Sequence, residues 1–260
     1  MSKETLQEYY AFTVETAYQA GRLTLGYFLS EIEISFKSDA SPVTIADRQA
    51  EVFIRNQIEK KFPEHTIIGE ELGLSNQSGG NTRWIIDPID GTKAFMRGVP
   101  LYGVLIGLEI DGIIEVGAAY LPALNEMVSA ARGLGCWWNG RRAHVSSINK
   151  LEESVLTTTS LRSFYRHNRQ KEFERLQNRC FHQAGWSDAY GYILVATGRA
   201  EIMLDPIMHI WDCAPFPVIL SEAGGYFGDW RGNPTITGVE GLATSQILLD
   251  QVLGVLNQEE

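Results

Sequence analysis

The spacing of apolar residues changes along the chain, and the first sixty residues have a helical period. Apolar residues recur at steps of three and four between Leu6 and Phe28, which predicts an amphipathic helix over residues 4–28. A second helix is predicted from Thr44, its N-cap, to about Lys61, because Pro63 ends the pattern. We therefore expect two helices near the start of the chain.

The next part of the chain has the shorter period of a β-strand. Apolar runs separated by glycine and proline predict strands over residues 66–68, 83–86, 101–108, 113–119 and 127–131. A shorter alternation at Ile32, Ile34 and Phe36 predicts one more strand between the two helices. We expect the longer strands to follow one another as a meander.

Helical and strand patterns alternate in the last third of the chain. The predicted elements are a charged helix over 168–184, a strand over 200–204, a helix over 210–223, a strand over 241–243 and a helix near 246–256. Helices, then a strand meander, then alternating helices and strands predict layered sheets and helices in an α+β or α/β arrangement.

The composition is that of a folded globular chain. It has 260 residues, of which 44% are hydrophobic and 21% charged, and no repeat or low-complexity tract. We predict a single domain over residues 1–260, built from two tightly packed halves of about 1–140 and 141–260. A boundary between the halves is expected near residues 134–150.

Charge and cysteine content narrow the classes of partner. A net charge of −10 argues against a nucleic-acid partner, which would need a face of lysine and arginine. The acid excess leaves two interpretations open, simple solubility and a carboxylate cluster that binds metal. No apolar run approaches the roughly 18 residues of a membrane helix, so we expect no membrane partner. Three widely spaced cysteines and a polar start favour a reduced, cytoplasmic protein.

Three short acidic stretches stand at the ends of predicted elements. They are Gly69-Glu70-Glu71, Asp87-Pro88-Ile89-Asp90-Gly91-Thr92 and Trp211-Asp212-Cys213-Ala214-Pro215. Half-buried carboxylates cost several kcal/mol unless they are paired or bound to a metal, and few cations lie near the second stretch in the sequence. An Asp-x-x-Asp turn can direct two carboxylates and the Ile89 carbonyl at one hard cation such as Mg²⁺.

Gly91 and Thr92 add groups that suit a phosphate. Glycine allows backbone N–H groups to approach an anion closely, and threonine adds a hydroxyl. Each stretch also has an ordinary interpretation, because Asp-Pro and Asp-Gly are common turn dipeptides, Glu70 fits a solvated strand end and Asp212 fits the first turn of a helix. Their shared position at element ends, where sites are usually built, favours a common site.

These motifs, in this order and spacing, resemble the inositol monophosphatase family of Mg²⁺-dependent phosphomonoesterases. The resemblance rests on GEE at 69–71, DPIDGT at 87–92 and WDxA at 211–214, with VTxAD at 43–47 and EAGG at 222–225. It covers essentially the whole chain. It implies an αβαβα layered sandwich that is usually assembled as a dimer, so a homodimer is expected.

The resemblance also implies which residues bind metal. Glu70, Asp87 and the carbonyl of Ile89 would hold a first Mg²⁺. Asp87, Asp90 and Asp212 would hold a second Mg²⁺. Two such ions lower the pKa of a water and stabilise the leaving oxygen of an in-line displacement.

Further roles follow from the same resemblance. Asp47 would support a third, weaker metal ion or its waters, and it is expected in the catalytic set with Thr92 and Glu70. Thr92 and Glu70 would orient the attacking water. Apart from the resemblance, backbone N–H groups at Gly91 and Thr92 are expected to neutralise phosphate oxygens of the substrate if a helix begins there.

Other stretches resemble the histidinol-phosphatase branch of the family, namely residues 93–100, 121–124, 132–140 and 186–192. Asp188 falls where the family's backbone contacts substrate, although Ser187 stands where that branch commonly has glycine. Asp205 aligns with the family's substrate-contacting acid. Two carboxylates suit the ammonium and imidazole of L-histidinol phosphate. We therefore expect Mg²⁺-dependent hydrolysis of this ester, a step of histidine biosynthesis.

Several alternatives stay open at this point. Asp188 also fits a helix N-cap, and Asp205 fits a strand-end turn before Pro206. The substrate could instead be inositol 1-phosphate or a broad set of phosphate monoesters. A third interpretation is that the chain has no catalytic activity and binds RNA. The acidic net charge argues against it. Lys37 and its polar neighbours suggest that a loop near 38–43 closes over the substrate.

Overall fold

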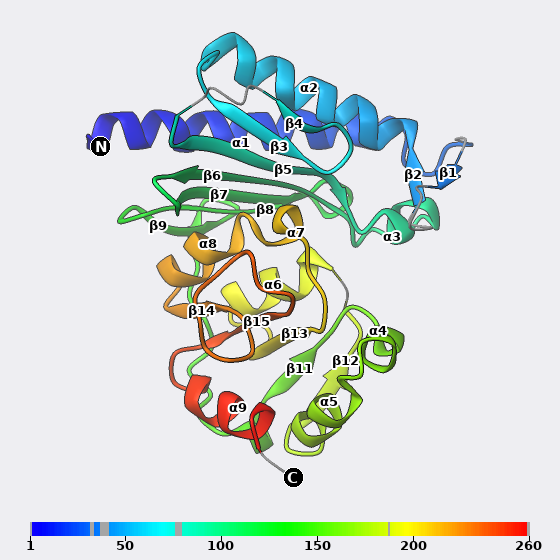
Figure 1. The fold of residues 1–260 in the computed structure, drawn as a ribbon, viewed down its shortest axis with the longest axis vertical. Coiled ribbons are helices and arrows are strands. Elements are labelled where there is room, and N and C mark those ends of the chain that lie inside the picture. Colours follow the sequence, from blue (N-terminus) through cyan, green and yellow to red (C-terminus); the bar gives the residue numbers. More distant parts are fainter. Residues whose placement is uncertain (1, 32–33, 37–41, 76–79, 187, 259–260) are drawn as a thin grey trace.

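The computed structural model describes residues 2–31, 34–36, 42–75, 80–186 and 188–258. Figure 1 shows these residues as alternating layers, with two helices, a sheet, a middle group of helices, a second sheet and an outer group of helices. The predicted αβαβα layered fold, with mixed sheets between helices, is confirmed.

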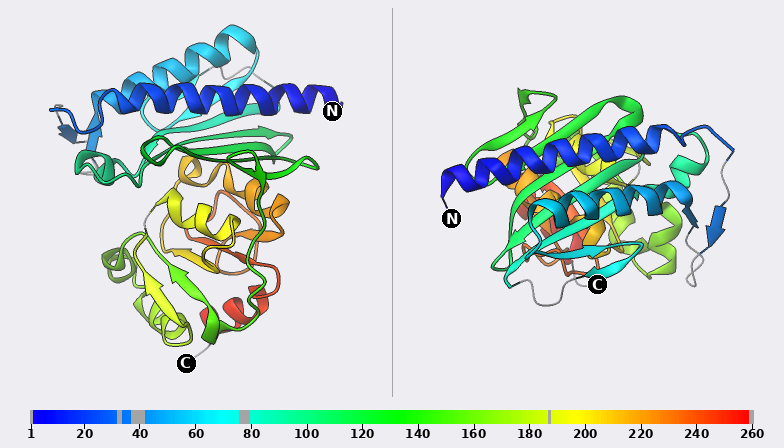
Figure 2. Two further views of the ribbon diagram at one scale, coloured as in Figure 1. Left: turned by 180° about the vertical axis from the view of Figure 1, so that it is seen from behind. Right: turned by 90° about the horizontal axis from the view of Figure 1, so that it is seen from above.

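The two predicted N-terminal helices make the first layer. α1 spans Lys3–Leu25 and α2 spans Ile45–Lys61, and Figure 2 shows them across one face of the larger sheet. α2 begins at Thr44, the predicted N-cap, whose hydroxyl accepts the Ala46 N–H. The apolar faces of both helices pack in one cluster with Trp84 of the sheet. This packing fixes the start of α2 near Thr92, which follows the strand that carries Trp84.

The larger sheet has eight strands in the order β10-β9-β8-β7-β6-β5-β3-β4. β3 and β5 are parallel, and the meander from β5 to β10 is antiparallel. Its strands are β3 (Thr66–Gly69), β4 (Gly73–Ser75), β5 (Thr82–Asp90), β6 (Gly103–Ile110), β7 (Ile113–Leu121), β8 (Glu126–Ala131), β9 (Gly135–Trp138) and β10 (Arg141–Arg142). A separate short pair consists of β1 (Ile34–Phe36) and β2 (Pro42–Thr44).

The smaller sheet has five strands in the order β12-β11-β13-β15-β14. They are β11 (Val155–Thr157), β12 (His182–Ala184), β13 (Ile202–Asp205), β14 (Gly225–Gly228) and β15 (Gly241–Ser245). β11 is parallel to both of its neighbours, so the ends of β11 and β13 lie at the same edge. This edge carries part of the candidate site.

The remaining helices fill the middle and outer layers. Between the sheets lie α6 (Ala189–Ala196), α7 (Ile210–Cys213) and α8 (Phe216–Glu222), and outside the smaller sheet lie α4 (Leu161–Arg166), α5 (Gln170–Gln177) and α9 (Leu249–Leu256). Short 3₁₀ turns cover Pro122–Leu124 and Leu151–Glu153, and α3 (Thr92–Met96) follows β5 directly. Alternation along β5 directs Ile85 to the middle layer and Trp84 to the first layer.

The helix predicted over 168–184 is wrong at its C-terminal end. α5 stops at Gln177, and residues 182–184 form β12 beside β11. The Phe181 N–H donates to the Ser154 carbonyl at 3.0 Å, which begins this pairing. Strand pairing with a distant segment therefore overrides the local helical pattern.

The helix predicted over 210–223 is two helices rather than one. α7 ends at Cys213 and α8 begins at Phe216, with Pro215 between them. Proline has no N–H to donate to a preceding turn, so the first helix ends here. The pattern also missed α6, which lines the candidate site, and β11, which leads to Thr159 at its edge.

The chain passes from one sheet to the other within residues 143–154. The single domain with two halves and a boundary near 134–150 stays a prediction. No helix among the described residues is long and apolar enough to cross a membrane. Ile32 of the expected strand, Ser187, Lys37 and residues 38–41 of the expected loop lie outside the described residues.

Candidate active site

The end of β5 directs two carboxylates to one side of the sheet. In a regular strand Asp87 and Asp90 would point to opposite faces, but the pairing with β6 shifts register between them. The Ile89 N–H donates to Asp87 Oδ1 at 3.0 Å and closes this irregular turn. Gly91 then adopts a left-handed conformation with φ of 80°, which glycine accepts without strain, and α3 begins.

Asp212 reaches the same point from the other half of the chain. α7 lies against β5 and β6, where a Cβ at Gly107 would come within 2.8 Å of Ala214. Only glycine on β6 allows this approach. The Asp212 carboxylate accepts the His209 N–H at 2.9 Å, which orients it within α7. Asp212 is thus brought beside residues that are more than a hundred positions away in the sequence.

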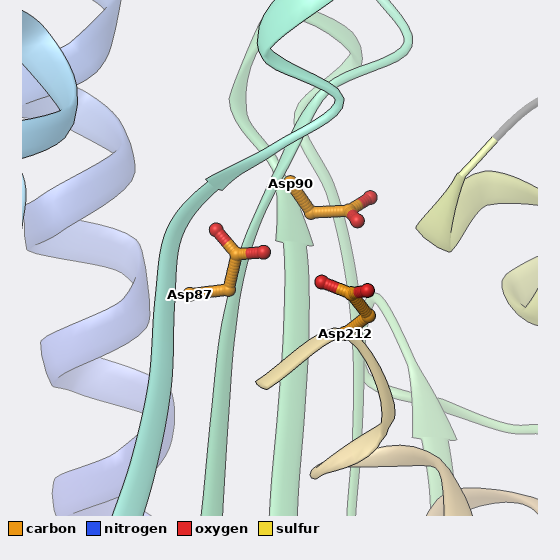
Figure 3. Close-up of side chains that lie close together, drawn as sticks. All are labelled: Asp87, Asp90 and Asp212. Carbon is orange, nitrogen blue, oxygen red and sulfur yellow. The ribbon is translucent and has the colours of Figure 1, made fainter. Parts of the chain in front are cut away.

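Figure 3 shows the Asp87, Asp90 and Asp212 carboxyl groups turned toward one another. Their facing oxygens all lie within 4.8 Å of one another. Asp87 is only 2% exposed and Asp90 only 8% exposed. Burial raises the pKa of Asp87 well above its usual range, and the charges of Glu70, Asp90 and Asp212 raise it further. Burial raises the pKa of Asp90 as well, as do the charges of Asp188 and Asp212.

This donor set fits a hard divalent cation. Mg²⁺ takes oxygen ligands and is commonly bound through carboxylates. Two of these three mutually repelling carboxyl groups are buried and the third, Asp212, is half-buried, so they gain more from a shared cation than three solvated groups would. An acidic cluster able to hold a divalent metal ion is therefore present at the junction of the two sheets.

Glu70 lies in the turn between β3 and β4, on the wall of the same cavity as the three aspartates. A buried ion pair on α2 holds this turn. Glu51 is 0% exposed, accepts the N–H groups of Glu71 at 2.7 Å and Leu72 at 3.0 Å, and pairs with Arg55 at 2.8 Å. The sequence analysis missed Glu51 and Arg55, although their spacing of four on a predicted helix is a signal of an ion pair.

Thr92 and Asp47 meet on the other side of the cluster. Thr92 Oγ1 lies 3.3 Å from Asp47 Oδ1 and 3.1 Å from the Ile89 carbonyl. Asp47 is 0% exposed, and its Oδ2 accepts both the N–H and the hydroxyl of Thr44. Burial raises the pKa of Asp47, and the Thr44 hydrogen bonds oppose that rise. Asp47 is therefore linked to the cavity by its hydrogen bond with Thr92.

Two adjoining cavities open beside the cluster and share Asp90, Lys93, Asp188 and Asp212. One has a volume of about 160 Å³ and is lined by residues that the sequence predicts to bind metal or phosphate. Its walls come from Pro42, Glu70, Asp87, Ile89, Gly91 and Thr92. The other, of about 180 Å³, extends to Thr159, Ser163, Tyr192, Asp205 and Met208. Together they join an acidic cluster to a pocket with two further acids.

Asp188 occupies the N-cap position of α6 but does not act as a side-chain cap. Its φ of 52° and ψ of −145° are rare for a residue with a side chain, and no cap hydrogen bond from the described backbone reaches its carboxylate. A Cβ at Gly91 would lie 3.1 Å from Asp188 Oδ2, so the carboxylate points toward the turn at Gly91. The Ala189 N–H donates to Asp90 Oδ2 at 2.7 Å and ties this segment to the cluster.

Asp205 closes the far end of the pocket. It is the last residue of β13, only 3% exposed, and accepts hydrogen bonds from Thr159 N–H, Thr159 Oγ1 and the Tyr192 hydroxyl at 3.1–3.3 Å. Burial raises the pKa of Asp205 to about 7, and the hydrogen bonds from Thr159 oppose the rise. Thr159 belongs to no motif, and Tyr192 was noted only as the end of the stretch 186–192, so neither was expected to contact Asp205.

Comparison with known proteins shows the family of this chain. The model of the inositol monophosphatase family matches residues 5–259, and the chain belongs to that family. A histidinol-phosphatase of Chlorobaculum parvum is 43% identical over 89% of this chain and 90% of its own length. A histidinol-phosphatase of Mycobacterium tuberculosis is 37% identical over 87% and 89%. The Nus factor SuhB of Escherichia coli is 34% identical over 86% and 87%.

Solved structures share the whole fold. The extragenic suppressor protein suhB of Bartonella henselae has a TM-score of 0.90 at 28% identity, over 96% of this chain and 98% of its own. The inositol monophosphatase of Anabaena has a TM-score of 0.87 at 29% identity, over 98% of each chain. The resemblance inferred from the sequence motifs is confirmed at the level of the family.

Proposed function

We propose that this chain is a Mg²⁺-dependent histidinol-phosphatase, which hydrolyses L-histidinol phosphate to L-histidinol and phosphate in histidine biosynthesis. The observation that carries the proposal is the cluster of Asp87, Asp90 and the half-buried Asp212 beside a pocket with two more acids. The relatives of Chlorobaculum and Mycobacterium, both named histidinol-phosphatase, support the choice of substrate.

The proposed metal ligands are those that the family resemblance implies. Glu70, Asp87 and the Ile89 carbonyl would hold one Mg²⁺, and Asp87, Asp90 and Asp212 would hold a second. Burial and mutual repulsion of these carboxylates support the assignment. When bound, the two ions supply a water of lowered pKa and offset the charge of the phosphoryl group. A third, weaker ion near Asp47 belongs to the same proposal.

The chain's own groups would orient the reactants. Thr92 lines the cavity and its Oγ1 has a single proton, so donation to Asp47 Oδ1 leaves the oxygen's lone pairs available as acceptors. Thr92 can then accept a hydrogen bond from the attacking water, and Glu70 can accept another. The backbone N–H groups of Gly91 and Thr92 would hold phosphate oxygens, since the left-handed turn at Gly91 leaves them near the cluster.

The remaining pocket suits a cationic alcohol. Asp188 and Asp205 line the cavity of about 180 Å³ next to the cluster, and either can pair with an ammonium group. The imidazole of histidinol becomes a second cation when it is protonated. A neutral polyol needs fewer carboxylates, and an anionic sugar bisphosphate would be repelled.

An inositol-1-monophosphatase or a broad-specificity phosphomonoesterase is the second candidate. It uses the same metal ligands, and the solved inositol monophosphatase of Anabaena has the same fold. A non-catalytic role like that suggested by the name of the SuhB relative is weaker. The net charge of −10 argues against RNA binding, and a binding protein has no need of the metal cluster.

We also propose a homodimer that acts in the cytoplasm. The homodimer follows from the family resemblance, and the three free cysteines are consistent with a reducing compartment. Size-exclusion chromatography with light scattering tests the homodimer directly. A mass of one chain at micromolar concentration would contradict it.

The direct test of the function compares two substrates. Phosphate release is measured from L-histidinol phosphate and from myo-inositol 1-phosphate, each with Mg²⁺ and with EDTA. We expect activity only with Mg²⁺ and a preference of about a hundredfold for histidinol phosphate, roughly 2.7 kcal/mol of discrimination. Equal or reversed rates would keep the metal mechanism and overturn the substrate assignment.

A further inference from the structure

Thr159 lies at the edge where two parallel strands of the smaller sheet end. The register pairs Leu156 with Ile202 and Thr157 with Met203, so two residues further on Thr159 stands beside Asp205. β11 carries no acidic motif; it ends at Thr157, and two more threonines, Thr158 and Thr159, follow it directly. The strand register therefore brings a hydroxyl residue to the acidic pocket.

Thr159 contacts both acids of the pocket at once. Its hydroxyl donates to Asp205 Oδ2 at 3.1 Å and accepts the Asp188 N–H at 3.0 Å. Its own N–H donates to Asp205 Oδ1 at 3.3 Å. The Thr159 hydroxyl thus donates its single proton to the Asp205 carboxylate and accepts a hydrogen bond from the backbone of Asp188.

The contact with Asp188 falls on a strained backbone. A φ of 52° with a ψ of −145° is unfavourable for a residue other than glycine and persists only where the surroundings hold it. The described contacts that hold it are Asp188 N–H to Thr159 Oγ1 and Ala189 N–H to Asp90 Oδ2. Strain of this kind sets the direction of a side chain, here toward Gly91.

We propose that Thr159 is a positioning residue that sets the separation and direction of Asp188 and Asp205, and that it thereby determines specificity for a phosphate ester whose alcohol part is cationic. The inference rests on the proposed function. Thr159 itself binds no metal ion and holds no phosphate. Its effect reaches the substrate through the two carboxylates, so it changes substrate binding more than the chemical step.

The test compares three variants of the full-length protein. Thr159→Val keeps the backbone N–H and the shape of the side chain but removes both Oγ1 hydrogen bonds. Thr159→Ser keeps the hydroxyl and should restore the native behaviour. Thr158→Val is the matched control, because the neighbouring Thr158 Oγ1 is buried without a hydrogen-bond partner among the described residues.

Steady-state kinetics with L-histidinol phosphate and p-nitrophenyl phosphate provide the readout. In Thr159→Val we expect KM for histidinol phosphate to rise about tenfold, as the loss of one or two hydrogen bonds implies. KM for p-nitrophenyl phosphate, which has no amine, should rise several times less, and kcat should fall less than KM rises. Thr159→Ser should lie within about twofold of native and Thr158→Val should match native.

A double-mutant cycle with Asp205→Asn keeps the test decisive. If Thr159 acts through Asp205, the double variant Thr159→Val/Asp205→Asn should raise KM by a smaller factor than the product of the two single-variant factors. Equal KM changes for the two substrates, or fully multiplicative effects, would overturn the proposal. If Thr159→Val does not fold, judged by circular dichroism, Thr159→Ala takes its place with the same criteria. A native enzyme without preference for histidinol phosphate would overturn the proposed function instead.

Discussion

Asp87 and Asp205 are two almost equally buried acids at strand ends, and they differ in what surrounds their carboxyl groups. At the end of β5, Asp87 is 2% exposed and is surrounded by three other carboxyl groups. At the end of β13, Asp205 is 3% exposed and accepts three hydrogen bonds from Thr159 and Tyr192. The first group needs a cation from outside, whereas the protein itself supplies the partners of the second.

A cluster of facing carboxylates and a carboxylate held by hydrogen-bond donors are two different kinds of site, although both consist of buried acids. Carboxylates that face one another fit a metal centre because a shared cation removes their repulsion. A carboxylate held by donors keeps a defined direction and can distinguish one substrate from another. Burial alone does not tell the two apart, so the neighbours of each oxygen have to be examined.

Loss of one cluster carboxylate should have the largest effect. Asp90→Asn or Asp212→Asn should lower kcat about a thousandfold or more, since a metal ion contributes several kcal/mol and each 1.36 kcal/mol is tenfold in rate. In EDTA the same variants should unfold at a higher temperature than native, because repulsion is relieved. Thermal unfolding and phosphate release test both. Asp250→Asn, on the exposed start of α9, is the control, and near-native activity in either cluster variant contradicts the metal assignment.

The ion pair below the Glu70 turn should come next. Glu51→Gln leaves Arg55 buried without its charge partner, which typically costs 3–5 kcal/mol. The free energy of unfolding should fall by about that amount, and the Mg²⁺ concentration for half-maximal activity should rise as the turn loosens. Urea unfolding and Mg²⁺ titration measure the two effects. Glu153→Gln removes an exposed pair with Lys150 and should change neither.

Asp205 should make stability depend on pH in the unusual direction for an acid. Its pKa is raised from 3.8 to about 7 in the folded state, so the folded protein binds the extra proton between these values. The stabilisation is complete below about pH 4 and is lost as pH rises toward 7. In EDTA, the free energy of unfolding of Asp205→Asn relative to native should therefore rise by about 2–3 kcal/mol between pH 5 and 7. A difference that is constant over this range contradicts the assignment.

The smallest of these effects is expected at Asp188. Asp188→Asn keeps the size of the side chain and removes its charge, so KM for L-histidinol phosphate should rise about ten- to thirtyfold, as loss of a charged hydrogen bond implies. KM for myo-inositol 1-phosphate should change by less than about threefold. Asp188→Gly should behave in the same way while it relieves the backbone strain. Equal losses for both substrates would remove Asp188 from substrate selection.

The sequence was most informative where the chemistry is local. Asp87, Asp90 and Gly91 stand in one short stretch after an apolar strand, and their meeting at a strand end follows from that. Thr44 as an N-cap could be predicted for the same reason, since a cap depends on its next few residues. Asp212 was linked to them through the family resemblance, because its approach depends on the glycine contacts between β6 and α7.

Features that depend on pairing across the chain could not be predicted. Thr159 becomes important only through the register of β11 with β13, and β11 itself was not predicted. The left-handed backbone of Asp188 is imposed by Thr159 and Asp90 and leaves no mark in the local sequence. Glu51 and Arg55 could have been noticed as a pair, but their link to the Glu70 turn exists only in the fold.

Direct location of the metal tests the central claim, that carboxylates from both halves of the chain hold it. Crystals grown with Mn²⁺ in place of Mg²⁺ allow the ions to be found by anomalous scattering. The account predicts ions in the space enclosed by Asp87, Asp90 and Asp212, with Glu70 on the first of two. Mn²⁺ bound elsewhere, or no ion in crystals of an enzyme active with Mn²⁺ in the same solution, would contradict it.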